Sequence, residues 1–172
     1  QADAMNVFNP VPGQERALRD ALGRFATGVC VVTARMESGA PVGMTVNSFA
    51  SVSLDPPLVL WSPARASARF PAFMVASHFA IHVLRDTQAG LSGHFSRGGA
   101  GFAGLSYAEG LHGLPILQDC LASFECAAEA RHDGGDHVIL IGRVLRARQM
   151  PGAPLLFSAG HYGCFVPIGN NL

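Results

Sequence analysis

The sequence predicts a mainly β protein that folds as an antiparallel barrel with a few short helices. Runs of β-branched and aromatic residues of moderate length recur along the 172-residue chain. Turn residues separate neighbouring runs at hairpin spacing, which favours antiparallel pairing. Helical periodicity is confined to short stretches, so helices are expected to supplement the sheet. The length suits one domain, and we expect an irregular arm over residues 1–13 and a single domain over residues 14–172.

The first expected elements are a helix and a β-hairpin. Residues 14–25 place apolar side chains on one helical face, and Gly28 is a stop signal for that helix. Residues 29–33 form a β-branched run, a turn follows at Ser38 and Gly39, and a second extended run reaches Val46. This pattern predicts a hairpin.

Shorter elements are expected in the middle of the chain. Residues 58–62 and 79–84 have the composition of strands, and a helical stretch interrupted by Pro71 lies between them. A short helix is expected over residues 87–95. A glycine-rich loop follows at residues 98–104.

The strongest hairpin signal lies further along the chain. Residues 123–131 and 137–148 have the composition of two long strands, and Asp-Gly-Gly-Asp at residues 133–136 separates them. Long strands joined by tight turns are typical of antiparallel barrels.

Composition limits the classes of partner. Charged residues make up 14% of the chain and hydrophobic residues 49%, so we expect part of the surface to be buried in an oligomer. The formal net charge is zero and the arginines are not clustered, which argues against nucleic-acid binding. The chain contains no lysine, so a phosphate group must be bound by arginine, hydroxyl or backbone N–H groups.

Cysteine usage and hydropathy indicate a cytoplasmic protein. The four cysteines have no CxxC spacing and are expected to be free thiols of a reducing compartment. No apolar stretch approaches membrane-spanning length and no leader-like segment opens the chain, so no membrane association is expected. The histidines show no spacing with cysteines or carboxylates that suits a metal ion, and no metal site is expected.

Residues 43–57, reading GMTVNSFASVSLDPP, are rich in short hydroxyl and amide side chains and almost free of charge. Such groups suit a neutral ligand with several polar points and a phosphate tail, held through hydroxyls and backbone N–H groups. A polar edge strand followed by a Ser-rich turn explains the same segment about as well. The residues alone leave the two interpretations open.

Residues 99–104, reading GAGFAG, have the GxGxxG spacing of a dinucleotide-binding turn. That fingerprint requires a strand before it and a helix after it. Residues 92–97 are not strand-like, and the LSYAEGLHGLP that follows contains two glycines and a proline. We therefore expect a surface loop and no Rossmann fold.

Four blocks in order resemble the flavin reductase-like family. They are ALGRFATGVCVVTA at residues 21–34, GMTVNSFASVSLDPPLVL at 43–60, HDGGDHVILIGRV at 132–144 and GHYGCF at 160–165. The resemblance implies an FMN-binding split β-barrel of Greek-key antiparallel topology, paired as a homodimer with the flavin at the subunit boundary. It also implies NAD(P)H as hydride donor and a separate flavin-dependent oxygenase that receives diffusible reduced flavin.

The resemblance also implies a flavin site. Thr45, Val46, Asn47 and Ser48 match the segment along the isoalloxazine ring and ribityl chain, and Asn47 has the donor and acceptor that suit the ring's polar edge. Serines 62 and 67, with the arginine at 97, are expected around the phosphate, although a helix N-cap explains the serine at 67 equally well. The expected cofactor-binding residues are Met44, Thr45, Val46, Asn47, Ser48, Trp61, Ser62, Ser67, Phe95 and Arg97.

His137 and Tyr162 are the expected catalytic residues. In the family, the matching Asp-His pair and Gly-x-Tyr-Gly segment lie where NAD(P)H docks against the flavin. His137 would orient the carboxamide without acting as acid or base, because hydride moves directly between the two cofactors. The alternative is a histidine that ends a hairpin and bonds to the neighbouring carboxylate.

Together these expectations describe an NAD(P)H-dependent FMN reductase. The expected cofactors are FMN, with FAD as the other candidate, and either NADH or NADPH as substrate. A non-catalytic flavin-binding or storage protein of the same barrel is the alternative, and it would bind FMN without consuming NADH. A haem-binding relative is a further rival, for which no axial histidine stands out. Because the chain has neither lysine nor a covalent tether for flavin, bound FMN is expected to exchange with solvent.

Overall fold

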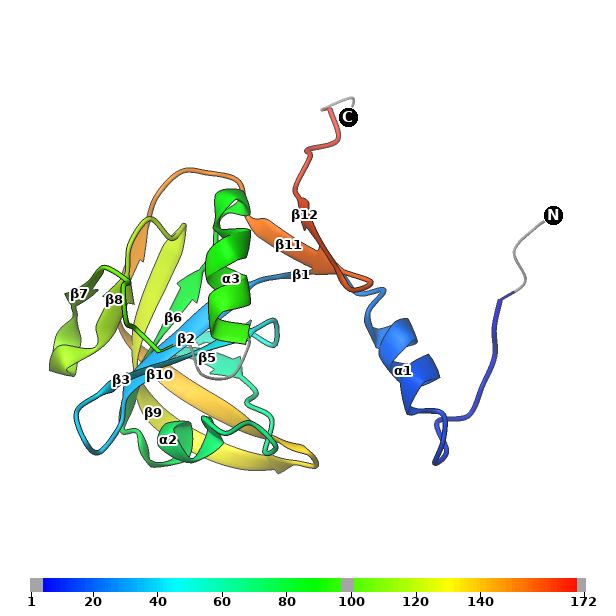
Figure 1. Cartoon of the computed structure of the whole chain (residues 1–172), viewed down its shortest axis with the longest axis horizontal. Coiled ribbons are helices and arrows are strands. Elements are labelled where there is room, and N and C mark those ends of the chain that lie inside the picture. Colours follow the sequence, from blue (N-terminus) through cyan, green and yellow to red (C-terminus); the bar gives the residue numbers. More distant parts are fainter. Residues whose placement is uncertain (1–4, 97–100, 170–172) are drawn as a thin grey trace.

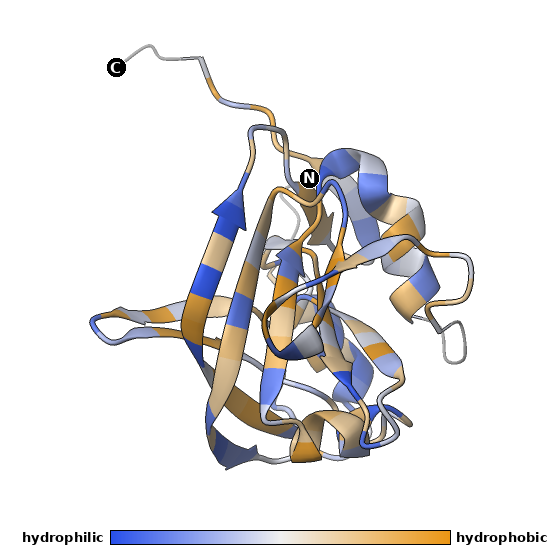
Figure 2. Cartoon of the chain, turned by 90° about the vertical axis from the view of Figure 1, so that its left-hand side faces the viewer, coloured by the Kyte–Doolittle hydropathy of each residue, from blue (hydrophilic) through white to orange (hydrophobic). Residues whose placement is uncertain are grey.

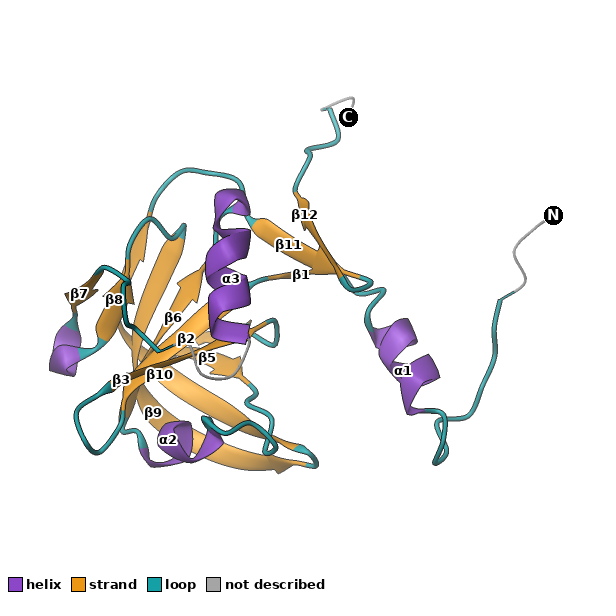
Figure 3. Cartoon of the chain, in the orientation of Figure 1, coloured by secondary structure: helices purple, strands orange, loops and turns teal. Residues whose placement is uncertain are grey.

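A computed structural model describes residues 5–96 and 101–169 of the chain. The protein is mainly β, with three short α-helices set around antiparallel sheets (Figure 1, Figure 3). The predicted mainly β, antiparallel split-barrel fold is confirmed. No helix in these described ranges is both long enough and apolar enough to cross a membrane.

The largest sheet has seven strands, and each is antiparallel to its neighbours. Both predicted hairpins are present in it, the first joining β2 to β3 and the second joining β9 to β10. Across the sheet the order is β3 (Pro41–Val46), β2 (Cys30–Arg35), β6 (His78–Val83), β9 (Ala122–Gly134), β10 (His137–Gln149), β5 (Pro57–Trp61) and β4 (Ala50–Leu54).

Two smaller sheets and the helices complete the chain. The three-stranded sheet contains β1 (Thr27–Gly28), β11 (Leu155–Ser158) and β12 (His161–Cys164), and the two-stranded sheet contains β7 (Tyr107–Glu109) and β8 (Pro115–Leu117). The helices are α1 (Glu15–Leu22), α2 (Phe70–Val75), α3 (Ala89–Ser96) and the 3-10 turns η1 (Asp86–Gln88) and η2 (Leu111–Gly113). The five short strands of these two sheets were not predicted.

The period of two along the strands separates the two larger clusters of the core. Hydrophilic and hydrophobic residues alternate along the strands in Figure 2. On β2, Val32 points into a cluster centred on Trp61, whereas Val31 points into a second cluster that lies under α3. The Trp61 ring meets the rings of Phe73 and Phe79 edge-on, with centroids 5.0 and 5.9 Å apart. Packing in the second cluster holds α3 beside β3.

The hydroxyl-rich segment divides between two environments. Its first residues end β3, residues 47–49 form a loop, and β4 is the exposed edge strand of the large sheet. The interpretation as a polar edge strand therefore holds for residues 50–54. The interpretation as a ligand-binding segment is left for residues 43–48. The GAGFAG loop follows α3 and leads towards β7, so a helix precedes it where the dinucleotide fingerprint needs a strand. Gly99 and Ala100 of that loop lie outside the described residues.

Candidate active site

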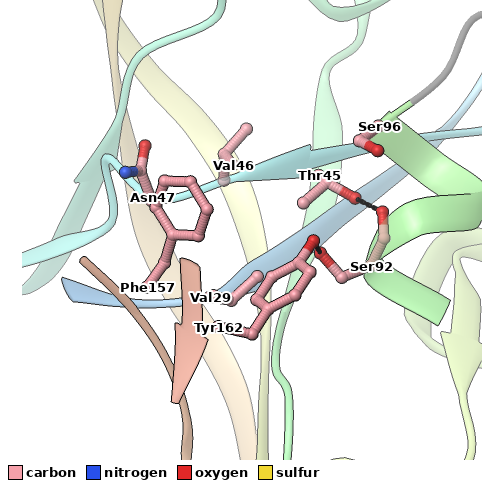
Figure 4. Close-up of a pocket in the computed structure, with 8 residues that line it drawn as sticks. All are labelled: Val29, Thr45, Val46, Asn47, Ser92, Ser96, Phe157 and Tyr162. Carbon is pink, nitrogen blue, oxygen red and sulfur yellow. Dashed lines mark hydrogen bonds between the residues drawn. The ribbon is translucent and has the colours of Figure 1, made fainter. Parts of the chain in front are cut away.

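A cavity of about 190 Å³ lies where the end of β3, α3 and the C-terminal hairpin meet. In Figure 4 the two rings come from β11 and β12 and face the residues of β3 and α3 across the opening. The lining residues are Val29, Thr45, Val46, Asn47, Ser92, Ser96, Phe157 and Tyr162. The structure thus brings together four of the residues predicted for the site, three for the flavin and one for catalysis.

Ser92 connects three elements around this cavity. The Thr45 hydroxyl donates to the Ser92 carbonyl oxygen at 2.7 Å, and the Ser92 hydroxyl shares a 2.7 Å hydrogen bond with the Tyr162 hydroxyl (Figure 4). Ser92 itself is fully buried, whereas Tyr162 is 45% exposed. The buried Ser92 therefore fixes the position of the Tyr162 ring, which faces solvent.

Gly43 allows α3 to lie this close to β3. A Cβ atom on Gly43 would be 2.6 Å from Cε1 and 2.7 Å from Cδ1 of Phe95, whose ring is buried under the helix. Contacts of that length are not tolerated in a packed core. The absent side chain at Gly43 is thus the local reason why α3 and Ser92 reach the cavity.

Replacing Gly43 with alanine should displace α3 and destabilise the protein by about 1–3 kcal/mol, the usual cost of overpacking. FMN affinity should fall as well, because Ser92 moves with the helix. Urea unfolding and flavin fluorescence titration measure the two effects. Gly93→Ala is the matched control, since a Cβ there meets no atom within 4 Å. If Gly43→Ala is as stable as the wild type, the packing of the Phe95 ring does not require a glycine at position 43.

A second group of predicted residues continues from the cavity along the loop after β5. The Ser48 hydroxyl accepts a 2.9 Å hydrogen bond from the backbone N–H of Ser62, which ties the end of β3 to the end of β5. Further along, the Ser67 hydroxyl accepts a 3.2 Å hydrogen bond from the N–H of Arg69, the residue immediately before α2. Ser67 therefore serves as a turn residue near a helix start, and that role leaves its oxygen able to accept a further bond.

Arg69 joins this loop to α3. Its guanidinium Nη1 donates to the carbonyl oxygen of Phe95 at 2.6 Å, and the side chain is half-buried. Arg69 therefore adds positive charge beside the last turn of α3, between the residues predicted for the flavin ring and those predicted for the phosphate. Arg97, predicted for the phosphate, lies outside the described residues.

His137 lies at the turn between β9 and β10, next to the same loop. It forms a bridge with Ala64, and the N–H of Val138 donates to the Pro63 carbonyl at 3.2 Å. His137 Nδ1 lies 2.7 Å from Oδ1 of Asp136, and this hydrogen bond lowers the pKa of the Asp136 carboxyl below its usual value. The side-chain contact of His137 is thus the one expected of a histidine that ends a hairpin and bonds to the neighbouring carboxylate. Its ring is still half-exposed beside the loop after β5.

His137 and Tyr162 do not meet within one chain. His137 is absent from the lining of the cavity that contains Tyr162. In Figure 1 the β9–β10 turn lies at the bottom of the view, whereas β12 lies near the top. A ligand that contacts both residues of one chain must span that separation.

Three predicted residues have their side chains in the core. Trp61 is fully buried and Phe95 is almost so, while Met44 packs in the same cluster as Trp61. The indole Nε1 of Trp61 has no hydrogen-bond partner in the described part of the chain. None of these three residues lines the cavity, so their contribution is to position the neighbouring polar residues.

The chemistry of the lining suits a flavin ring. Val29, Val46 and Phe157 present apolar surface, while Asn47 offers a donor and an acceptor at the rim. The polar groups are neutral, as an uncharged ring with a carbonyl and imide edge requires. The ring system fits only if one side of the cavity is open. Asn47 and Tyr162 are both exposed to solvent, and they mark this open side.

Four lining residues were missed from the sequence: Val29, Ser92, Ser96 and Phe157. Ser92 had a signal, because it lies in the segment LSGHF at residues 91–95, whose resemblance to a Leu-Ser-x-x-Phe segment of the family is the reason for predicting Phe95. Phe157 had none. It reaches the cavity through pairing of β11 with β1, whose register joins Thr27 to Phe157.

Comparison with known proteins gives consistent results. The chain is 55% identical over 160 residues to the FMN reductase (NADH) SmoA of Agrobacterium fabrum, covering 93% of this chain and 91% of that protein. It is 44% identical over 153 residues to the reductase component of the flavin-dependent trigonelline monooxygenase of Acinetobacter baylyi, covering 88% of this chain and 49% of that protein. The NADH:FAD oxidoreductase SgcE6 of Streptomyces globisporus, solved with NAD and FAD fragments, superposes with a TM-score of 0.87 at 34% identity, covering 95% of this chain and all of that one.

The family assignment rests on most of the chain. Residues 22–165 match the family described as the flavin reductase like domain, and this range includes every residue of the cavity. The four blocks that resembled this family at the level of sequence lie at least in part within it. The chain belongs to the flavin reductase like domain family.

Proposed function

We propose that this protein reduces FMN with NADH and releases the reduced flavin to a separate oxygenase component. The observation that carries the proposal is the half-open cavity in which Thr45, Asn47, Ser92 and Tyr162 converge beside apolar walls. The activities named for the relatives support it, since they include an FMN reductase (NADH) and reductase components of monooxygenases.

The protein's contribution to the reaction is binding and alignment. Flavin supplies the hydride-accepting chemistry when it is bound. Asn47 and the backbone at the end of β3 orient the polar edge of the ring, and Phe157 and Val46 cover its apolar part. The Ser92–Tyr162 hydrogen bond positions the tyrosine ring at the solvent side, where the nicotinamide approaches. Alignment of two rings at contact distance removes much of the entropic cost of a bimolecular step.

Exchange of flavin is consistent with this site. The lining contains no charged side chain, and the chain has no lysine. Phosphate binding then depends on Ser62, Ser67 and backbone N–H groups, supplemented by arginine. A few such hydrogen bonds, at about 1.5–3 kcal/mol each when the acceptor is charged, give micromolar affinity and leave the cofactor free to dissociate.

We propose further that the protein is a homodimer and that a second copy covers α1. No residue of α1 is buried, and Figure 1 shows the helix standing away from the barrel. Leu22 is 66% exposed and Phe25, just beyond the helix, is 79% exposed. Leu18 and Leu22 lie four residues apart and so share one face. An unpartnered apolar face of this kind is typical of a subunit interface.

The location proposed for the protein is the cytoplasm. All four cysteines are free, two of them buried, and burial raises the pKa of the Cys30 thiol to about 12. Unpaired thiols persist in a reducing compartment.

Steady-state assays of NADH oxidation test the function directly. With catalytic amounts of protein, added FMN should stimulate NADH consumption, and the parallel assays with FAD and riboflavin report flavin preference. A storage protein would bind FMN with no turnover of NADH. Absence of NADH oxidation at saturating FMN, from protein shown to bind the flavin, would contradict the reductase assignment.

Substitution of His137 by alanine tests the nicotinamide side. The KM for NADH should rise about three- to tenfold, the value of one lost hydrogen bond, while the dissociation constant of FMN changes less. His132→Ala, on the other strand of the same hairpin, is the control and should leave both values near wild type. Unchanged KM and FMN affinity in His137→Ala would remove this histidine from the site.

A further inference from the structure

Three arginines have no partner within residues 5–96 and 101–169. The side chains of Arg16, Arg19 and Arg24 make no hydrogen bond or ion pair with any other described residue, and all three residues are exposed on or just beyond α1. The other described arginines bond to carboxylates, backbone carbonyls or a methionine sulfur. In a chain without lysine, these three cationic side chains have no acceptor within the described ranges and can therefore bind an anionic ligand.

Two of the three line a second cavity. It has a volume of about 400 Å³, lies between α1 and the β11–β12 turn, and is lined by Arg19, Asp20, Gly23, Arg24, Phe157, Ala159 and Gly160. The end of α1 is tied to this turn, because the N–H of Ala159 donates to the Gly23 carbonyl at 2.7 Å and the Ser158 hydroxyl donates to the same oxygen at 3.4 Å. The cavity is thus formed by two elements in direct contact.

Phe157 joins the second cavity to the flavin site. Phe157 lines both cavities, which are therefore adjacent, and a ligand can have one end beside Asn47 and the other beside Arg19. The polar face of α1 is turned towards this cavity, since Arg19 and Asp20 line it and Leu18 and Leu22 do not. A second copy packed on the apolar face of α1 would therefore leave Arg19 and Arg24 facing the cavity.

We infer that this second cavity binds the adenosine diphosphate half of a dinucleotide, an inference that rests on the proposed function of the neighbouring site. Two unpaired guanidinium groups match the two charges of a pyrophosphate. The Asp20 carboxylate is an acceptor for ribose hydroxyls, and the Phe157 ring offers a face for stacking. NADH carries this adenosine diphosphate group, and its nicotinamide ring would lie at the first cavity.

Calorimetric titration with ADP-ribose tests the inference without relying on turnover. FMN-saturated protein should bind ADP-ribose, and the double variant Arg19→Gln, Arg24→Gln should bind it about tenfold or more weakly, because charge-assisted hydrogen bonds to the phosphates are lost. Arg16→Gln removes the same charge from the same helix but does not line the cavity, so it should bind as wild type does. No binding by wild type, or equal binding by wild type and double variant, would overturn the inference.

A further comparison tests whether the group is that of NADH. The double variant should raise the KM for NADH but not that for reduced nicotinamide mononucleotide, which lacks the adenylate. An equal loss with the truncated and the complete ligands would contradict the site. Failure of the proposed function gives a different result, because wild type would then oxidise neither nicotinamide substrate while its ADP-ribose affinity could still be measured.

Discussion

A chain carrying both Leu18→Glu and Leu22→Glu should be monomeric at concentrations where the wild type is a dimer. Each leucine buried at an interface contributes about 1.5–3 kcal/mol, and a symmetric dimer would bury each of them twice. The four lost side chains amount to about 6 kcal/mol or more, so the dissociation constant should rise more than a thousandfold. Light scattering across a dilution series measures the change.

The same variant tests whether the partner completes the site. Asn47 and Tyr162 are exposed in the single chain, so FMN should bind more weakly to the monomer. Met36→Glu, in the β2–β3 turn, is the control for introducing a glutamate at an exposed apolar position, and it should remain dimeric. A double variant that stays dimeric would exclude α1 from the interface. A monomer with wild-type FMN affinity would show that one chain holds the whole flavin site.

Replacing Glu125 with alanine should destabilise the fold by about 3 kcal/mol. The Glu125 side chain is only 1% exposed, yet it accepts two hydrogen bonds from Arg146, at 2.6 and 2.8 Å, and one from the N–H of Leu111 at 2.5 Å. Arg148 lies 3.2 Å away. Removal of the carboxylate leaves that N–H and the two guanidinium groups without their acceptor. The free energy of unfolding from urea titration measures the loss.

Glu129→Ala is the matched control on the same strand. Glu129 pairs with Arg143 in a similar bidentate geometry, but the pair lies in solvent and should contribute little. If the two variants lose equal stability, burial of Glu125 does not matter. A loss at Glu125 alone would confirm that the buried carboxylate anchors the short turn η2 to the large sheet.

The pH dependence of stability should distinguish Glu125 from His82. Burial raises the pKa of Glu125, but its hydrogen bonds with Arg146 and Leu111 outweigh that effect, and the net pKa lies below the usual 4.5. The Glu125 carboxylate therefore stabilises the fold above that pH and loses this effect as the pH falls further. In Glu125→Gln, the fall of the unfolding free energy at acid pH (the acid limb) should be less steep there. Burial lowers the pKa of His82 from 6.5 to about 4, so stability should already fall between those values in both proteins. An unchanged acid limb in Glu125→Gln would contradict this account.

Hairpins were predictable because their signals are local. The β9–β10 turn is encoded by Asp-Gly-Gly-Asp, and the two strands on either side carry matching lengths of extended sequence. By contrast, β1 contains two residues, and its partner β11 lies far along the chain. No local pattern identifies such a pair, because its stability comes from a neighbour that is distant in sequence.

The flavin site was predictable in part for the same reason. Thr45, Val46 and Asn47 are consecutive and form a recognisable segment, and Tyr162 lies in another. Ser92 and Phe157 were missed, although they line the same cavity. Their relation to the site depends on how α3 packs on Gly43 and how β11 pairs with β1.

The sequence by itself determined the antiparallel strand pattern, the supply of neutral hydroxyl and amide groups, and the dependence on arginine for any phosphate contact, because these follow from residue types and short spacings. Only the tertiary structure decided which groups meet. Thr45 and Ser92 are 47 positions apart, and Ser92 and Tyr162 are 70 apart, yet hydrogen bonds of 2.7 Å join them. Contacts of that separation depend on the packing of whole elements, which no short segment encodes.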